Sequence, residues 1–271
     1  MSLKESNDRL PGDIPAPAKT DKELIRERFY HKFDEYDRLA RAQKRICKAL
    51  SDEMRALIPP SAVGNALEIG AGTGFLTQDM VRRYPDSEWH LNDLIPEAGE
   101  YLSRYTPGVR THWLWGDAEK MDFPQGLDLI TSACTIQWFS DITAFARKAA
   151  AATQPGGWLA LSTFGPDNFK EIRATTGDGL EYLSTEELAK VFSDAGYEIK
   201  ILRDWYEQLS MDDPSAVLRH IKETGVNSVK KAAWGPDRFE KFNADYKRLF
   251  STPEGHVTLT FHPVIIIAQK K

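Results

Sequence analysis

The sequence is poor in cysteine, has no long apolar run and carries no excess of basic residues. Its only cysteines, Cys47 and Cys134, are far apart, so they give no basis for a disulfide framework or a cysteine-based metal site. The 35 basic and 40 acidic residues give a net charge of −5, which argues against a nucleic-acid partner. No apolar stretch approaches the ~18 residues of a membrane span. We therefore expect a cytoplasmic protein without a membrane partner.

The chain divides into a short tail and one domain. Residues 1–20 contain prolines and many small or charged residues, which predicts a flexible tail. Residues 21–271 are expected to form a single α/β domain with helical additions at about 21–57 and 213–251. The apolar spacing within 21–57 predicts one or two amphipathic helices that end before Pro59.

A glycine-rich turn is the centre of the domain. The run from Leu67 to Gly74 reads L-E-I-G-A-G-T-G, and its first residues predict a buried strand over 66–70. The apolar residues after Thr73 fall at helical spacing. Glycines between a strand and a helix allow a sharp turn and bring a ligand close to main-chain N–H groups. The alternative is a tight turn without a ligand.

Strands and helices then alternate. Further strands are predicted at 89–93, 109–115, 128–132, 158–163, 197–209 and 257–269, with a P-G-G turn before the strand at 158. This alternation implies a mostly parallel sheet, in which ligands bind at the carboxyl ends of the strands. The glycine turn, Asp93, Asp117 and Ala133 all follow strands at such ends. Asp93 is placed to accept ribose hydroxyls, and its alternative role is to cap the helix from Pro96.

The contracted glycine motif with Glu68 before it resembles motif I of the class I S-adenosylmethionine (SAM) methyltransferases. That resemblance implies a seven-stranded Rossmann-like sheet flanked by helices, with SAM held by its amino-acid end and ribose. It also implies that Asp117 and the Ala118 N–H meet the adenine. The cofactor-binding residues expected are Tyr36, Gln43, Glu68, Gly70, Gly72, Gly74, Asp93, Leu94, Asp117, Ala118 and Ala133.

Two patterns are absent. The N/D-P-P-Y/F motif of amino-methylating nucleic-acid enzymes is replaced by S-A-C-T at residues 132–135. No cluster of histidine and acidic residues has metal-ligand spacing, so we expect no metal. Cys134 is more typical of a packing residue than of a nucleophile.

Several scattered motifs resemble the malonyl-[acyl-carrier protein] O-methyltransferase family of biotin synthesis. They are Y-D at 36–37, I-Q-W-F at 136–139, I-R at 172–173, T-G-V-N at 224–227 and V-T-L-T-F-H-P at 257–263. One departure is Phe261, where tyrosine is expected. The resemblance implies methyl transfer from SAM to the free carboxylate of a malonyl thioester on an acyl-carrier protein.

The resemblance also suggests site roles. Arg173 is the candidate anchor for the malonyl carboxylate, because its planar fork pairs bidentately with one; the alternative is a surface salt bridge. Tyr36 and Gln43 are expected to close a lid over SAM, with Tyr36 and Gln137 in the catalytic set. Gln137, Trp138 and His262 are expected to contact substrate, although Trp138 also suits a core and His262 a structural role.

Two basic stretches remain to be explained. Residues 22–48 carry a net charge of +4 and residues 213–251 a net charge of +3. They are either solvated helix faces or a surface for the acidic carrier protein. The helices of both stretches are expected to form a lid over a monomeric enzyme. The alternatives are a carboxyl methyltransferase of a small free acid, such as trans-aconitate, and a SAM-binding protein without turnover.

Overall fold

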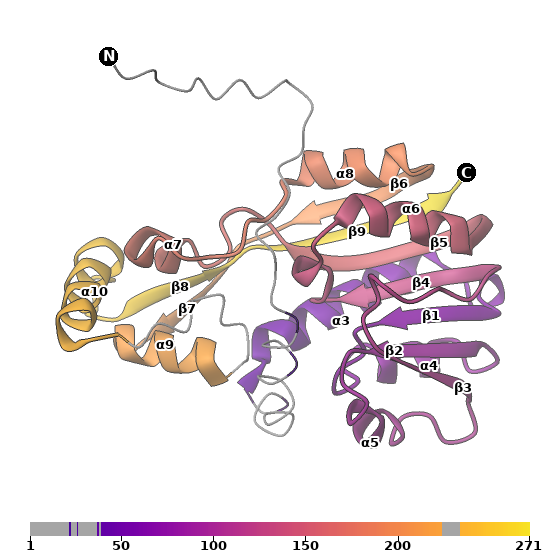
Figure 1. Ribbon diagram of the computed structural model, residues 1–271, viewed down its shortest axis with the longest axis horizontal. Helices are drawn as coiled ribbons and strands as arrows, with labels where there is room; N and C mark the ends of the chain where they lie inside the picture. The colour runs from indigo at the N-terminus through magenta and orange to yellow at the C-terminus, as the bar shows by residue number, and fades with distance from the viewer. Residues whose placement is uncertain (1–21, 23–25, 27–36, 38, 224–233) are drawn as a thin grey trace, which may run out of the picture.

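A computed structural model describes residues 22, 26, 37, 39–223 and 234–271. A seven-stranded sheet runs through it in the order β3-β2-β1-β4-β5-β9-β6 (Figure 1). Its strands are β1 (Asn65–Ile69), β2 (Glu88–Asp93), β3 (Arg110–Trp115), β4 (Leu127–Ala133), β5 (Thr153–Phe164), β6 (Tyr197–Asp204) and β9 (Pro263–Lys270). Only β9 runs antiparallel to its neighbours, β5 and β6. The predicted seven-stranded, mostly parallel sheet is confirmed.

Helices cover both faces of this sheet. On one face pack α3 (Arg41–Leu57), α4 (Thr77–Arg83) and α5 (Ala98–Leu102). On the other pack α6 (Ile142–Ala152) and α8 (Thr185–Asp194). Because side chains alternate along a strand, Ile266 and Ile267 of β9 enter opposite cores, and both are fully buried. Such two-sided burial explains the continuous apolar runs of the strands.

Three local predictions were wrong about strand limits. The expected strands 197–209 and 257–269 are each divided, giving β7 (Glu207–Met211) and β8 (Val257–Phe261), which pair in a separate two-stranded sheet. The ladder breaks at His262, whose N–H and C=O bond to Asn168 and Gly165, and Pro263 has no N–H to donate. The P-G-G turn lies inside β5, where the register with β4 shifts between Leu127 and Leu129.

The helical insertion lies beyond the carboxyl ends of the central strands (Figure 1). It contains α9 (Pro214–Glu223) and α10 (Pro236–Phe250), which share an apolar cluster with α7 (Lys170–Thr176), β8 and the first turns of α3. In α7 the fully buried Glu171 accepts from Thr260 N at 3.0 Å and Thr260 Oγ1 at 2.5 Å. This carboxylate fixes α7 to β8.

Two short 3-10 turns, η1 (Pro60–Ala62) and η2 (Ile136–Trp138), complete the elements that the structure assigns in its described residues. Among those residues, no helix combines the length and the apolar character needed to cross a bilayer. The predicted helices of residues 21–57 are represented by α3, which ends before Pro59 as expected, whereas most of 21–40, including Tyr36, lies outside the described residues.

Candidate functional site

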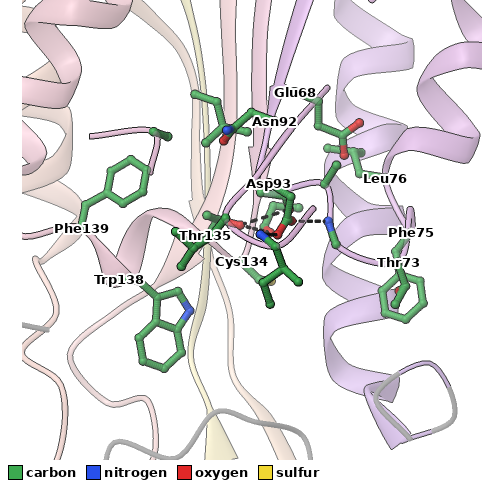
Figure 2. A pocket seen from close by; sticks show the side chains of 18 of the residues that line it. Glu68, Thr73, Phe75, Leu76, Asn92, Asp93, Cys134, Thr135, Trp138 and Phe139 are labelled. Atoms are coloured by element: carbon green, nitrogen blue, oxygen red, sulfur yellow. Dashed lines mark hydrogen bonds between the residues drawn. The ribbon is translucent and has the colours of Figure 1, made fainter. Parts of the chain in front are cut away.

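One pocket opens at the carboxyl ends of β1, β2 and β4 (Figure 2). The space free of atoms within it is about 1020 Å³, open solvent at its mouth included. Its walls come from α3, the glycine turn, the ends of β2 and β3, and the loop after β4. The lining residues predicted from sequence are Gln43, Glu68, Gly70, Gly72, Asp93, Leu94, Asp117, Ala118, Ala133 and Trp138.

The three glycines of the turn have positive φ angles: +66° at Gly70, +55° at Gly72 and +89° at Gly74. A Cβ at Gly70 would collide with the Thr135 side chain, and one at Gly74 would lie 2.7 Å from the Tyr105 ring. At Gly72 a Cβ would meet nothing within 4 Å. Gly70 and Gly74 therefore permit close packing, whereas Gly72 borders the open pocket. Gly74 itself does not line the pocket.

The carboxylate of Asp93 connects β2 to the glycine turn. Its Oδ2 accepts from Gly72 N at 2.8 Å, and its Oδ1 accepts from Ile95 N at 2.9 Å. Burial raises the pKa of Asp93 to about 6, although these backbone donors favour the ionised form. Each oxygen retains a lone pair that can accept a hydroxyl. Asp93 thus holds the backbone of Gly72 and Ile95 and can still accept the ribose hydroxyls, as predicted.

Three acceptor atoms in the pocket wall are buried and lack a hydrogen-bond partner in the described part of the chain. They are Glu68 Oε2, Gln43 Oε1 and Thr73 Oγ1. Burial raises the pKa of Glu68 to about 8; the Thr77 hydroxyl beside the carboxylate partly opposes this shift, and the nearby Asp93 charge adds to it. Unpaired buried acceptors are costly, so this end of the pocket suits a ligand with an ammonium donor. The amino-acid end of SAM carries such a group.

At the opposite end Asp117 is held by a lysine that sequence reasoning missed. Lys22 Nζ lies 2.5 Å from Asp117 Oδ1, also pairs with Glu119, and lies 5.1 Å from the Phe139 ring centroid. Burial alone would raise the pKa of Asp117, but the hydrogen bond and charge of Lys22 outweigh it and lower that pKa. The only sequence signal was the basic run, which does not indicate which cation reaches the pocket.

The loop after β4 forms a further wall. Cys134 has a φ of +53°, its N–H donates to Ser162 O at 3.0 Å, and its carbonyl accepts Gln137 Nε2 at 2.6 Å. Gln137 does not line the pocket. Trp138 both lines the pocket and packs in the cluster with the insertion, so its two predicted roles coincide.

Cys134 shares the pocket wall with Cys47, which sequence reasoning did not place there. Burial raises the pKa of the Cys134 thiol to about 12 and that of Cys47 well above its usual range. Both are therefore protonated thiols at neutral pH, as expected of packing residues.

Besides Gln137, two predicted substrate residues lie outside the pocket. Arg173 is exposed on α7, and its guanidinium donates to the Pro166 carbonyl. Its expected role as anchor of the malonyl carboxylate stays a prediction, and the inward face of α7 is taken by the fully buried Glu171. His262 is 6% exposed and lies in a separate network. Its Nε2 is 2.8 Å from Asp204 Oδ2, and its Nδ1 accepts Asp167 N–H at 3.2 Å, and these contacts suit the structural role considered as the alternative.

The predicted lid stays a prediction, because residues 224–233 and most of 21–40 lie outside the described residues. In the described parts of α9 and α10 no residue lines the pocket, and the described N-terminal residues that do so are Lys22, Gln43 and Cys47.

Comparison with known proteins agrees with this geometry. A family profile described as "Methyltransferase domain" matches residues 66–157. A malonyl-[acyl-carrier protein] O-methyltransferase of Prosthecochloris aestuarii is 38% identical over 92% of the chain and 94% of that protein. The chain belongs to the malonyl-[acyl-carrier protein] O-methyltransferase family. It is a SAM-dependent methyltransferase, and the pocket residues fit that cofactor.

Two further matches define the extent of the likeness. A malonyl-[acyl-carrier protein] O-methyltransferase of Bacteroides fragilis is 38% identical over 94% of this methyltransferase, which spans about half (52%) of that longer relative. The structure of a putative methyltransferase from Bacillus halodurans aligns with a TM-score of 0.59 at 15% identity, covering 82% of this chain and 98% of that one. This second likeness concerns the fold alone.

Proposed function

We propose that this methyltransferase transfers the methyl group of SAM to the free carboxylate of a malonyl thioester carried by an acyl-carrier protein. The observation that carries the proposal is the family match over nearly the whole chain, pocket-forming segments included. The methyl ester is the product, and S-adenosylhomocysteine is the second product.

The chemistry requires little from protein acids and bases. A carboxyl group with a reference pKa of about 3.5 is already ionised at pH 7. Bound SAM supplies a methyl group on a positively charged sulfur. One carboxylate oxygen forms the new C–O bond while the C–S bond breaks and its electron pair stays on sulfur. The protein's contribution is to align the two reactants and to exclude water.

Different pocket residues would contact different parts of SAM. Glu68 and Gln43 would receive the ammonium group, Asp93 the ribose hydroxyls, and Asp117 with the Ala118 N–H the adenine. Glu68 is the strongest of these assignments, because its Oε2 is buried without a hydrogen-bond partner among the described residues.

The acceptor would reach the methyl group beside the loop after β4. Trp138 and Cys134 line the pocket there, and Gln137 fixes the loop through the Cys134 carbonyl. As it lies in the structure, Arg173 can meet a substrate only outside the pocket. It remains our proposed anchor for the malonyl carboxylate, at a position outside the cofactor pocket.

Labelled methyl transfer tests the proposal. Malonyl-carrier protein, malonyl-CoA and trans-aconitate are offered as acceptors to wild type, Glu68→Gln and Arg173→Ala. We expect labelling of the malonyl thioester, a loss of SAM affinity in Glu68→Gln and unchanged SAM affinity in Arg173→Ala. Labelling of trans-aconitate alone would assign the enzyme to small free acids. SAM binding without labelling of any acceptor would indicate a protein without turnover.

A further inference from the structure

Helix α3 has a basic outer face directly behind the cofactor pocket. Arg41, Lys44, Arg45 and Lys48 follow the i, i+3, i+4, i+7 spacing of one helix face, and all four are exposed. The opposite face carries Gln43 and Cys47, which line the pocket. One helix thus joins the cofactor site to a cationic surface, which we call the α3 basic stripe, in a chain of net charge −5.

The described acids only partly neutralise this stripe. Arg45 pairs with Glu207 and Lys48 with Asp52. Lys44 instead donates to the backbone oxygen of Asp37 at 2.5 Å, and no ion pair is recorded for Arg41 within the described residues. Exposed pairs such as Lys48–Asp52 contribute little free energy. Lys48 therefore remains available to a partner, as does Arg41.

The stripe also reaches the pocket wall. Lys44 Nζ lies 4.7 Å from the ring centroid of Phe75, which lines the pocket. A macromolecule bound along α3 would therefore lie next to one wall of the pocket.

The other basic helix is a weaker candidate. On α10 both Lys241 and Arg248 bind Asp245, and Arg238 binds Asp178. No described residue of α10 lines the pocket.

We propose that the α3 basic stripe docks the acidic surface of the acyl-carrier protein around its phosphodiester-linked arm. This inference rests on the proposed function, because it assigns the partner surface of the same reaction. Complementary charge of this kind mainly accelerates encounter and fixes orientation, and it is screened by salt.

A charge-reversal pair tests the docking surface. The variant Arg41→Glu/Lys48→Glu is compared with the control Lys190→Glu/Lys241→Glu. Both control lysines are exposed and, like Lys48, form i,i+4 pairs with an aspartate. Each double variant lowers the net charge by four, so the overall charge is matched. Thermal unfolding and SAM affinity establish that each variant is folded. If Arg41→Glu/Lys48→Glu does not fold, the milder variant Arg41→Gln/Lys48→Gln takes its place.

For each protein kcat/KM is measured with malonyl-carrier protein and with malonyl-pantetheine, which lacks the carrier. We expect the stripe variant to lose about tenfold in kcat/KM with the carrier protein at low salt. That loss should shrink as salt rises, while malonyl-pantetheine and the control variant remain near wild type. Equal losses with both substrates, or no loss with either, would overturn the docking surface.

Binding of unacylated carrier protein is measured separately by fluorescence anisotropy. Weaker binding in the stripe variant alone is expected, and unchanged binding contradicts the docking proposal. If wild type methylates neither thioester, the proposed function fails. The anisotropy result then still decides whether the stripe binds an acidic carrier.

Discussion

Lys22 Nζ and Asp117 Oδ1 lie 2.5 Å apart, which places a cation from the start of the domain on the carboxylate at the end of β3. The same oxygen accepts Glu119 N at 3.0 Å. Oδ1 is therefore saturated, whereas the partner of Oδ2 among the described residues is the more distant Lys120, at 3.9 Å. This arrangement leaves Oδ2 available for the adenine contact that we propose for Asp117.

Replacing Lys22 with methionine should weaken SAM binding. The substitution keeps the apolar stem near Phe139 but removes the charged donor to Asp117. We expect an affinity loss of about three- to tenfold, in keeping with one lost charge-assisted hydrogen bond. Isothermal titration calorimetry measures it, with Lys190→Met as the surface control. Tighter binding in Lys22→Met would mean that the lysine competes with the adenine instead.

SAM binding near pH 7 should release a proton from Glu68. With a pKa of about 8 in the free protein, this carboxyl is mostly protonated at pH 7. A bound ammonium group favours the ionised form, so its pKa falls. Calorimetry in buffers of different ionisation enthalpy should show the release in wild type and its loss in Glu68→Gln. The same buffer dependence in both proteins would remove Glu68 from the ammonium contact.

The raised pKa of Glu68 also predicts how stability depends on pH. Between the ordinary carboxyl value of 4.5 and about 8, the folded state holds a proton that the unfolded state has lost. Unfolding therefore releases a proton from Glu68 in this window. Because of that release, the contribution of Glu68 to the free energy of unfolding falls as the pH rises from 4.5 to about 8. Denaturant unfolding of the SAM-free protein should show a steeper fall in wild type than in Glu68→Gln. Parallel pH profiles would contradict the assignment.

Two glycine substitutions should separate packing from binding. Gly70→Ala forces a Cβ into Thr135 at a φ of +66°, so we expect a loss of about 3 kcal/mol or more in the free energy of unfolding. Gly72→Ala meets open space and should cost only the ~1–2 kcal/mol of a left-handed residue. Its methyl group projects toward the ligand, so SAM affinity should fall. Urea unfolding and calorimetry measure the two effects, and equal destabilisation by both substitutions would contradict this division.

Glu171→Gln should destabilise the insertion without touching the cofactor. The buried carboxylate accepts the Thr260 N–H and hydroxyl from β8, and an amide would turn a donor toward one of them. We expect a loss of about 3 kcal/mol in the free energy of unfolding, with SAM affinity of the folded protein unchanged. A large fall in SAM affinity in folded Glu171→Gln would indicate that α7 supports the pocket.

The sequence predicted most of the cofactor wall because parallel strands bring their carboxyl ends together. Glu68 lies near the end of β1, Asp93 ends β2 and Asp117 follows β3. The strand–helix alternation was enough to place these strand ends at one edge, whereas the roles of the residues came from the family resemblance. Lys22 could not be found in this way, since its pairing with Asp117 spans 95 residues and depends on side-chain reach.

The direction of Arg173 was equally hidden. From the sequence, either Glu171 or Arg173 could be the side chain of α7 that turns inward. The donor that stabilises Glu171 there, Thr260, lies on β8, 89 residues away. The break at His262 has a similar cause, namely backbone bonds to the loop after β5 instead of to a neighbouring strand.

Intact-mass spectrometry of malonyl-carrier protein, incubated with SAM and the enzyme, tests the central claim most directly. The account predicts that the malonyl species gains the mass of one methyl substitution, in step with formation of S-adenosylhomocysteine. Acetyl-carrier protein, which lacks a free carboxylate, should stay unchanged. A malonyl species of unaltered mass under conditions where SAM is bound, or equal modification of the acetyl control, would contradict carboxyl methylation.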